Sequence, residues 1–201
     1  MGKPRRHPPV KLICGMISAH EELFEKASRL LQERFGEIDL KSEVMPFDHT
    51  DYYAKEMGEG LKRLFVSFSR LIPPESLAEI KLFTNGIESM FLKPGTENRM
   101  INLDPGYVAP NKLVLATTKD YAHRIYLGKG IFAEVTLKFY NGSFRPWEWT
   151  YPDYRTEGYI EFFNRVRRIY LDQLRSMGIS PHPSQWEVID EELPSDEPGG
   201  V

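Results

Sequence analysis

The order in which strand-like and helix-like patterns follow each other in the first half of the chain restricts the fold most. Short apolar or alternating runs, typical of strands, occupy residues 10–17, 38–44, 61–72 and 100–104. Apolar residues at helical spacing fill the intervals after the first and the third run. The resulting order, β-α-β-β-α-β, is that of the ferredoxin-like split βαβ arrangement, an antiparallel sheet with two helices on one face. We therefore predict an α+β fold with a ferredoxin-like core.

Both helical patterns carry recognisable end signals. Ser18 and Glu21 have the spacing of a capping box, in which two side chains bind the free amides of the first helical turn. Gly36 suits the position that follows the last turn of this helix. The second helix is expected to begin at Pro73-Pro74, because proline is tolerated in a first turn, and to continue until Pro94-Gly95 ends it.

The second half of the chain predicts an extension of the sheet and then a long helix. Asp104-Pro-Gly-Tyr107 has proline and glycine where a type II turn prefers them, and Asn141-Gly142 is a strong hairpin signal. The other expected elements are a strand at 112–118 (or a short helix), a hairpin of 123–127 and 131–140 around the three-residue loop 128–130, a strand at 143–147 and a helix at 156–177. We predict a C-terminal antiparallel β-meander followed by a long C-terminal helix.

Length and composition favour one domain. The chain has 201 residues, of which 41% are hydrophobic and 27% charged, an ordinary globular composition. Residues 1–9 hold three prolines and three basic side chains, whereas residues 179–201 hold four prolines and six acidic ones. We predict a flexible basic tail at 1–9, a single α+β domain at 10–178 and a flexible acidic tail at 179–201.

Charge and cysteine content restrict the compartment and the partners. The formal net charge of −3 gives no general attraction to nucleic acid or to an anionic membrane. No apolar run reaches the roughly 18–20 residues that a membrane-spanning helix needs. The lone Cys14 excludes an internal disulfide and a cysteine-rich metal site. We expect a cytoplasmic protein without a membrane partner.

The stretch from Arg99 to Trp149 carries polar and aromatic side chains within short apolar strands. Asn102 and Asp104 share one face of their strand, and Ile101 and Leu103 share the other. One interpretation is a solvated sheet face with cross-strand ion pairs. The other is a site for an anionic ligand, since arginine and lysine beside asparagine and threonine are typical of phosphate and carboxylate recognition. The candidate ligand-binding residues are Asn102, Tyr107, Lys112, Thr117, Lys119, Arg124 and Trp147.

Three carboxylates are candidates for catalysis. Glu43 lies near the end of a predicted strand, Asp48 begins the following loop, and Asp104 ends another strand. Carboxylates in such places can act as general acids or bases, or hold Mg²⁺ together with a phosphorylated ligand. The alternative is a solvated loop in which Asp48 and Thr50 bind neighbouring backbone groups. The sequence leaves open whether the protein is an enzyme and whether it uses a metal.

Nucleotide motifs are absent or incomplete. The chain has no G-x-x-x-x-G-K-[ST] loop. Thr117-Thr-Lys119-Asp120 is similar to the Thr-Lys-x-Asp motif that reads guanine in GTPases, but its aspartate comes one position too early. A standard P-loop GTPase is therefore excluded. The strand at 61–72 likewise lacks the glycine–aromatic pattern of an RNA-recognition motif, although arginines 165, 167 and 168 could contact phosphates.

Five segments, in this order, resemble one known family. They are Glu43-Val-Met-Pro-Phe-Asp48-His-Thr-Asp-Tyr-Tyr53, Asn102-Leu-Asp-Pro-Gly-Tyr-Val108, Lys112-Leu-Val-Leu-Ala-Thr-Thr-Lys119, His123-Arg-Ile-Tyr-Leu127 and Trp147-Glu-Trp-Thr-Tyr-Pro-Asp153. The chain is similar over most of residues 10–178 to an uncharacterised bacterial domain of unknown function, whose members are sometimes labelled "GTP-binding protein". The resemblance implies a single-domain bacterial protein and brings no reaction or catalytic residues.

We therefore expect a protein that binds, and in the enzymatic case acts on, a small anionic or phosphorylated ligand such as a nucleotide at a polar site on the sheet face. GTP itself stays an alternative that the motifs do not support. The second hypothesis is a non-enzymatic module that binds RNA or a protein.

Overall fold

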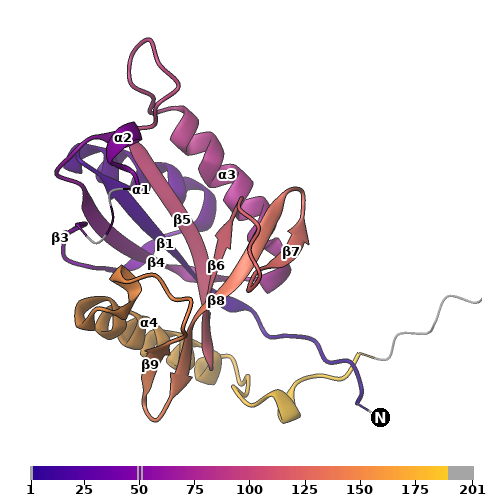
Figure 1. Cartoon of the computed structure of the whole chain (residues 1–201). Coiled ribbons are helices and arrows are strands. Elements are labelled where there is room, and N and C mark those ends of the chain that lie inside the picture. The colour runs from indigo at the N-terminus through magenta and orange to yellow at the C-terminus, as the bar shows by residue number, and fades with distance from the viewer. Residues whose placement is uncertain (1, 49, 51, 190–201) are drawn as a thin grey trace, which may run out of the picture.

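The computed structural model describes residues 2–48, 50 and 52–189, and over these residues nine strands form one antiparallel sheet (Figure 1). The strands are β1 (Val10–Ser18), β2 (Ile38–Lys41), β3 (Met45–Pro46), β4 (Lys62–Ile72), β5 (Ile101–Ala109), β6 (Lys112–Thr117), β7 (Ile125–Gly128), β8 (Ile131–Tyr140) and β9 (Ser143–Pro146). The α-helices are α1 (Glu21–Phe35), α2 (Ala54–Met57), α3 (Leu77–Ser89) and α4 (Glu157–Ser176). The predicted α+β class and the long C-terminal helix are confirmed.

The sheet runs in the order β2-β4-β1-β5-β6-β8-β7, with β3 paired to β4 and β9 paired to β8. The hairpins β7–β8 and β8–β9 are present, but β6 pairs with β8 rather than with β7, so the C-terminal strands do not form a simple meander. The first hairpin turns through Lys129 and Gly130, one residue fewer than predicted, because Gly128 pairs with Ile131. Asn141 and Gly142 both have positive φ, as the predicted hairpin turn requires.

Successive side chains of a strand point to opposite faces of the sheet, and apolar side chains pack on both faces here. In β1, Leu12, Cys14 and Met16 pack in a core with α1 and α3. Ile13 faces the other way, into a second core with α4. Ile101 and Leu103 of β5 belong to the core beneath α1 and α3. As expected from the sequence, Asn102 and Asp104 are therefore directed to the opposite face.

Some local predictions fail where tertiary contacts override them. The capping box is wrong, because Ser18 Oγ donates a hydrogen bond to the carbonyl of Met100 and accepts one from the amide of His20. The strand predicted at 38–44 ends at Lys41, since Ser42 leaves the pairing pattern and binds Phe65 through both its backbone and its hydroxyl. The second helix ends at Ser89, before the predicted Pro94-Gly95.

The type II turn predicted at Asp104–Tyr107 is also wrong, because β5 continues through Pro105 and Gly106 to Ala109. Pairing of β5 with β6 begins at Gly106, so Pro105 lies just outside that ladder and its missing N–H does not interrupt it. Gly106 permits close approach: a Cβ there would lie 2.3 Å from the carbonyl oxygen of Val114. The glycine thus serves strand packing rather than a turn.

The two predicted tails lie against each other where the structure describes them. Arg5 forms a bridge with Val188, and the amide of Ile189 donates to the carbonyl of Pro4. His7 packs on Trp186 with 4.4 Å between ring centroids. The tail flexibility expected from composition stays a prediction, and residues 190–201 lie outside the described part. Among the described residues, no helix is long and apolar enough to cross a membrane.

We predict that Gly106→Ala lowers the free energy of unfolding by about 1–3 kcal/mol, because the new methyl group would overlap the backbone of β6. The matched control is Gly86→Ala in α3, where an added Cβ meets no atom within 4 Å. That change should raise stability by about 0.5–1 kcal/mol, the helix propensity difference. Urea denaturation measures both, and a Gly106→Ala protein as stable as the wild type would contradict the β5–β6 packing.

Candidate functional site

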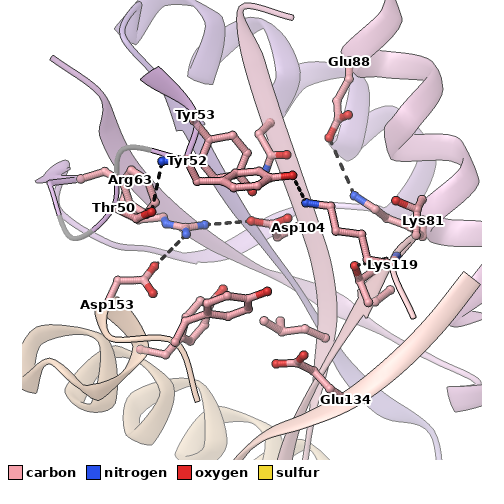
Figure 2. Close-up of a pocket in the computed structure, with 18 of the residues that line it drawn as sticks. Thr50, Tyr52, Tyr53, Arg63, Lys81, Glu88, Asp104, Lys119, Glu134 and Asp153 are labelled. Carbon is pink, nitrogen blue, oxygen red and sulfur yellow. Dashed lines mark hydrogen bonds and ion pairs between the residues drawn. The ribbon is translucent and has the colours of Figure 1, made fainter. Parts of the chain in front are cut away.

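A pocket of about 530 Å³ opens where β5 and β6 separate (Figure 2). The two strands pair only from Gly106 to Ala109 on the β5 side, although β6 continues to Thr117. Loop residues before α2, residues of α3 and the segment before α4 close the remaining sides. The lining residues are Phe47, Thr50, Tyr52, Tyr53, Arg63, Lys81, Asn85, Glu88, Arg99, Asn102, Asp104, Leu115, Ala116, Thr117, Thr118, Lys119, Arg124, Glu134, Tyr151, Pro152, Asp153 and Tyr154.

Arg63 of β4 is the buried cation of the pocket floor. Its Nη1 donates to Asp104 Oδ2 at 3.1 Å, and its Nη2 donates to Asp153 Oδ2 at 2.9 Å. Gly15 of β1 makes room for it, since a Cβ there would lie 3.0 Å from Arg63 Nη1. Only 2% of Arg63 is exposed, so the two carboxylates supply the counter-charge that water would otherwise supply.

Aromatic rings surround the Arg63 guanidinium. Its carbon lies 4.9 Å from the ring centroid of Phe47 and 5.6 Å from that of Tyr154. Burial alone would lower the pKa of Arg63, but Tyr154, Asp104 and Asp153 outweigh it and raise the pKa well above the usual value. Arg63 is therefore charged at every physiological pH.

Asp104 is ionised for a related reason. Burial acts to raise the pKa of its carboxyl group, but the charges of Arg63 and Lys81 outweigh burial and lower the pKa. The amide of Asn102 contributes in the same direction through a contact outside ordinary hydrogen-bond geometry, since Asn102 Nδ2 has no hydrogen-bond partner in the described chain. Some 24% of the Asp104 side chain stays exposed, so this carboxylate is accessible from the pocket.

Two side chains of α3 provide β5 with hydrogen-bond partners that a neighbouring strand would otherwise provide. Lys81 Nζ donates to the carbonyl of Leu103 at 2.7 Å, and Glu88 Oε1 accepts from the amide of Leu103 at 2.6 Å. Leu103 lies before the paired part of β5 and β6, so these backbone groups would otherwise lack partners on that side. The α3 side chains thus satisfy the strand edge at which the pocket begins.

Arg99 connects this wall to α2. Its Nη1 donates to Glu88 Oε2 at 2.7 Å, while its Nε and Nη2 donate to the two oxygens of Glu56 at 2.7 and 2.9 Å. The hydrogen bonds from Arg99 lower the pKa of Glu56. The same guanidinium donates to Asn102 Oδ1 at 3.1 Å, which fixes the orientation of that amide.

Arg124 and Glu134 form the opposite wall. Arg124 Nε donates to Glu134 Oε2 at 2.9 Å, and its two terminal nitrogens donate to the carbonyl of Lys119 and to the hydroxyl of Tyr151. His123 Nε2 lies 3.3 Å from the same carboxylate oxygen of Glu134. Each of the three guanidinium nitrogens of Arg124 thus has a protein partner, so Arg124 also positions Lys119 and Tyr151.

Lys119 differs from the other cations of the pocket. Its ammonium group contacts the hydroxyl of Tyr52 and lies 4.0 Å from the centroid of that ring (Figure 2). Among the described residues, no carboxylate lies within 4.0 Å of it, although its charge lowers the pKa of Glu56 from a longer distance. Its charge is therefore the one in the described lining that protein carboxylates leave unbalanced by direct contact.

Five of the residues predicted from the sequence come together in the pocket: Asn102, Asp104, Thr117, Lys119 and Arg124. The others do not line it. Tyr107 packs between two core clusters, Lys112 begins β6 at the far end of the strand, and Trp147 stacks on Trp149 with 5.1 Å between centroids. Whether any of these residues functions in binding or catalysis stays a prediction.

Glu43 and Asp48 are not lining residues of the pocket that contains Asp104, and both side chains are exposed. Burial is the main cause that raises the pKa of Tyr159, and the nearby charge of Asp48 raises it further. In the described part of the chain, no group of three His, Cys, Asp or Glu side chains could hold a metal ion. The positions of Glu43, Asp48 and Asp104 therefore do not support a Mg²⁺ site that the three carboxylates share.

Several pocket residues were not predicted from the sequence. Lys81 and Glu88 stand at positions i+4 and i+11 from Leu77, in helical register with the buried stripe of α3, and this signal could have revealed them. Arg63 interrupts an otherwise apolar strand, which is a weaker signal. Asp153 lies in the 3₁₀ turn Asp153–Arg155, where nothing in its neighbourhood indicates a long-range partner.

Comparison with known proteins adds one match. A family model described as "Domain of unknown function (DUF4416)" matches residues 8–170. No curated protein and no solved structure matches the chain. The matched range includes every residue that lines the pocket.

We predict that Asp104→Asn flattens the acid dependence of stability. The folded-state pKa of Asp104 is lowered, so its contribution to stability is present above the unfolded-state pKa of about 3.9 and is lost as pH falls through the folded-state value. The variant should unfold about 1–3 kcal/mol more easily at pH 7 and lose that difference toward pH 2.5.

Urea denaturation at several pH values measures this difference. Asp172→Asn, which removes an exposed ion pair with Arg175, is the control and should change stability by less than about 1 kcal/mol at any pH. A difference between wild type and Asp104→Asn that stays constant from pH 7 to pH 2.5 would show that Asp104 is not held ionised by Arg63.

Proposed function

The chain belongs to the DUF4416 family, a domain of unknown function, and from its pocket we propose that it binds a small anionic ligand. The observation that carries the proposal is Lys119, an ammonium group in the pocket lining without a carboxylate partner among the described residues. Lys119 is exposed at the rim of the pocket, so water screens its charge in part, and an anion that enters from solvent can reach it. An anionic ligand would neutralise the charge of Lys119.

The other lining groups suit a ligand of metabolite size. A volume of about 530 Å³ lies within the range of small-molecule sites. Thr117 and Thr118 lie close to Lys119 in sequence and line the same pocket, so their hydroxyl groups can bind anionic oxygens. Tyr52 and Tyr53 offer aromatic surface, with 5.0 Å between their centroids in an edge-to-face arrangement. A phosphorylated or carboxylated ligand with a planar part, such as a nucleotide, fits this lining.

A catalytic role for Asp104 is part of the proposal. Its lowered pKa keeps it ionised, so it is suited to accept a proton or to bind a donor rather than to act as an acid. We include Mg²⁺ in the proposal only together with a phosphorylated ligand, because a protein typically contributes one or two carboxylates to such a site and the phosphate supplies further oxygens. GTP has no special support, since the chain lacks the motif that a P-loop requires.

We also infer that β1, β2, β4 and β5, with α1 and α3, correspond to the ferredoxin-like unit expected from the sequence. Their spatial order, β2-β4-β1-β5, and their antiparallel pairing support this inference. In this arrangement the pocket lies at the outer edge of the unit, where β6 to β9 extend the sheet.

The alternative of an RNA- or protein-binding module has less support. Arg167 is engaged within the protein: its Nε donates to the carbonyl of Pro110, and its guanidinium carbon lies 3.4 Å from the ring centroid of Phe139 in β8. Arg165 and Arg168 remain exposed on α4. A binding loss on mutating these two arginines, measured with single-stranded RNA at several salt concentrations, would favour the alternative.

We predict that Lys119→Ala weakens anion binding about tenfold to a hundredfold, the loss expected for one charge-assisted contact. Thermal-shift titrations with inorganic phosphate, ribose 5-phosphate, GMP, GTP and citrate measure the effect. The control is Lys129→Ala, whose ammonium group pairs with Glu79 on the surface and should leave binding unchanged. If no compound raises the wild-type Tm, or if the shift persists in Lys119→Ala, the proposed function is wrong.

A further inference from the structure

Most charged side chains around the pocket form ion pairs, but one positive and one negative charge are left without a partner among the described residues, at different places in the lining. Arg124 and Glu134 form one balanced pair. Lys81 and Arg99 face Glu88 and Glu56, which gives two charges of each sign. Both groups are therefore neutral when every member is ionised.

Two charges remain after this pairing. Asp104 and Asp153 share Arg63 as their direct ion-pair partner, so this ion-paired group carries one excess negative charge, which the charge of Lys81 offsets only from a longer distance. Lys119 carries one excess positive charge, because no described carboxylate pairs with it. Asp104 and Lys119 both line the pocket, yet they form no ion pair with each other within 4.0 Å. Counted with Glu56, which pairs with Arg99 but does not line the pocket, these charges sum to zero; the lining alone carries one net positive charge.

Of the two carboxylates that share Arg63, only Asp104 is accessible. Its side chain is 24% exposed, compared with 7% for Asp153. Arg63 binds Oδ2 of Asp104, and no described residue donates a hydrogen bond of ordinary geometry to Oδ1. One carboxylate oxygen can therefore accept a donor from a ligand without displacing Arg63.

We infer that the ligand of this pocket is dipolar, with an anionic group that binds Lys119 and a nitrogen-borne cation or N–H donor that binds Asp104. This inference rests on the proposed function and narrows its ligand class to amino-substituted phosphates or carboxylates. A ligand with an anion alone would gain from Lys119 and lose from the excess charge near Asp104, because like charges repel in a partly enclosed site. A ligand with both groups gains at each end.

The shape of the lining agrees with this division. Asn102 lies two residues before Asp104 on the same face of β5, and its Nδ2 is a buried donor without a partner in the described chain. In Figure 2, Lys119 reaches toward Tyr52, Tyr53 lies next to Tyr52, and Asp104 is directed toward Arg63. The aromatic surface is therefore available to the part of a ligand that lies next to its anionic group.

Isothermal titration of the full chain with matched probes tests the inference. One set is O-phosphoethanolamine, ethyl phosphate and ethanolamine; the other is phenylalanine, 3-phenylpropanoate and phenethylamine. In at least one set, the probe with both charges should bind about tenfold or more tighter than the probe with the anion alone, as one charge-assisted contact predicts. Asp104→Asn should remove that preference, and Lys119→Ala should weaken both probes.

The outcomes separate the inference from the proposed function. Equal affinity for the anion and for the probe with both charges, lost in Lys119→Ala, would overturn the dipolar inference and leave the proposed anion site standing. The wild-type comparison alone decides this point if Asp104→Asn does not fold. Affinity that is unchanged in Lys119→Ala would overturn both. The absence of binding by all six probes would overturn the dipolar inference, and the titrations with phosphate, nucleotides and citrate then decide the proposed function. Lys129→Ala, on the surface turn, is the control and should bind as the wild type does.

Discussion

The pocket depends on the point at which β5 and β6 stop pairing. On the N-terminal side of Gly106, β5 is no longer paired with β6. Such an unpaired edge in the middle of a sheet would leave backbone groups without partners. Lys81 and Glu88 solve this locally, because they bind the carbonyl and the amide of Leu103. Pro105, which has no N–H to satisfy, stands directly at the separation. At the gap in the sheet, side chains of α3 therefore supply the hydrogen bonds of Leu103 that a paired strand would otherwise supply.

Buried charge holds the rest of the site in place. Arg63 joins β4 to Asp104 of β5 and to Asp153 in the turn before α4, so one guanidinium connects three distant segments. Removing Arg63 would leave the carboxylates of Asp104 and Asp153 without their ion-pair partner, a loss that costs about 3–5 kcal/mol at buried pairs. Replacing a whole buried pair by apolar residues often costs nothing, so the retained charges indicate a role other than stability. We interpret that role as shaping a polar pocket in a sheet face that α4 otherwise covers with apolar side chains.

Local patterns predicted the elements well, and long-range partners badly. Period-two and helical spacing located β1, β4, α1 and α4, and alternation placed Asn102 and Asp104 on the face opposite Ile101 and Leu103. Sequence alone could not show that Arg63 would select Asp153, 90 residues away, because nothing local marks that pair. Proline and glycine at 105–106 led to a wrong prediction, because this pair suits a turn but also suits the point in β5 at which pairing with β6 stops. Glu43 and Asp48 were grouped with Asp104 by residue type and by their places at the ends of predicted strands, and neither of them lines the pocket that contains Asp104.

The central claim is that Lys119 lies in the pocket as the binding group for an anion. A crystal grown at neutral pH and soaked in bromide tests it, because anomalous scattering distinguishes bromide from water and from lighter anions. The account predicts a bromide ion within contact distance of Lys119 Nζ, inside the space between β5 and β6. Bromide bound at surface lysines alone, with the Lys119 ammonium group directed away from the pocket, would contradict it.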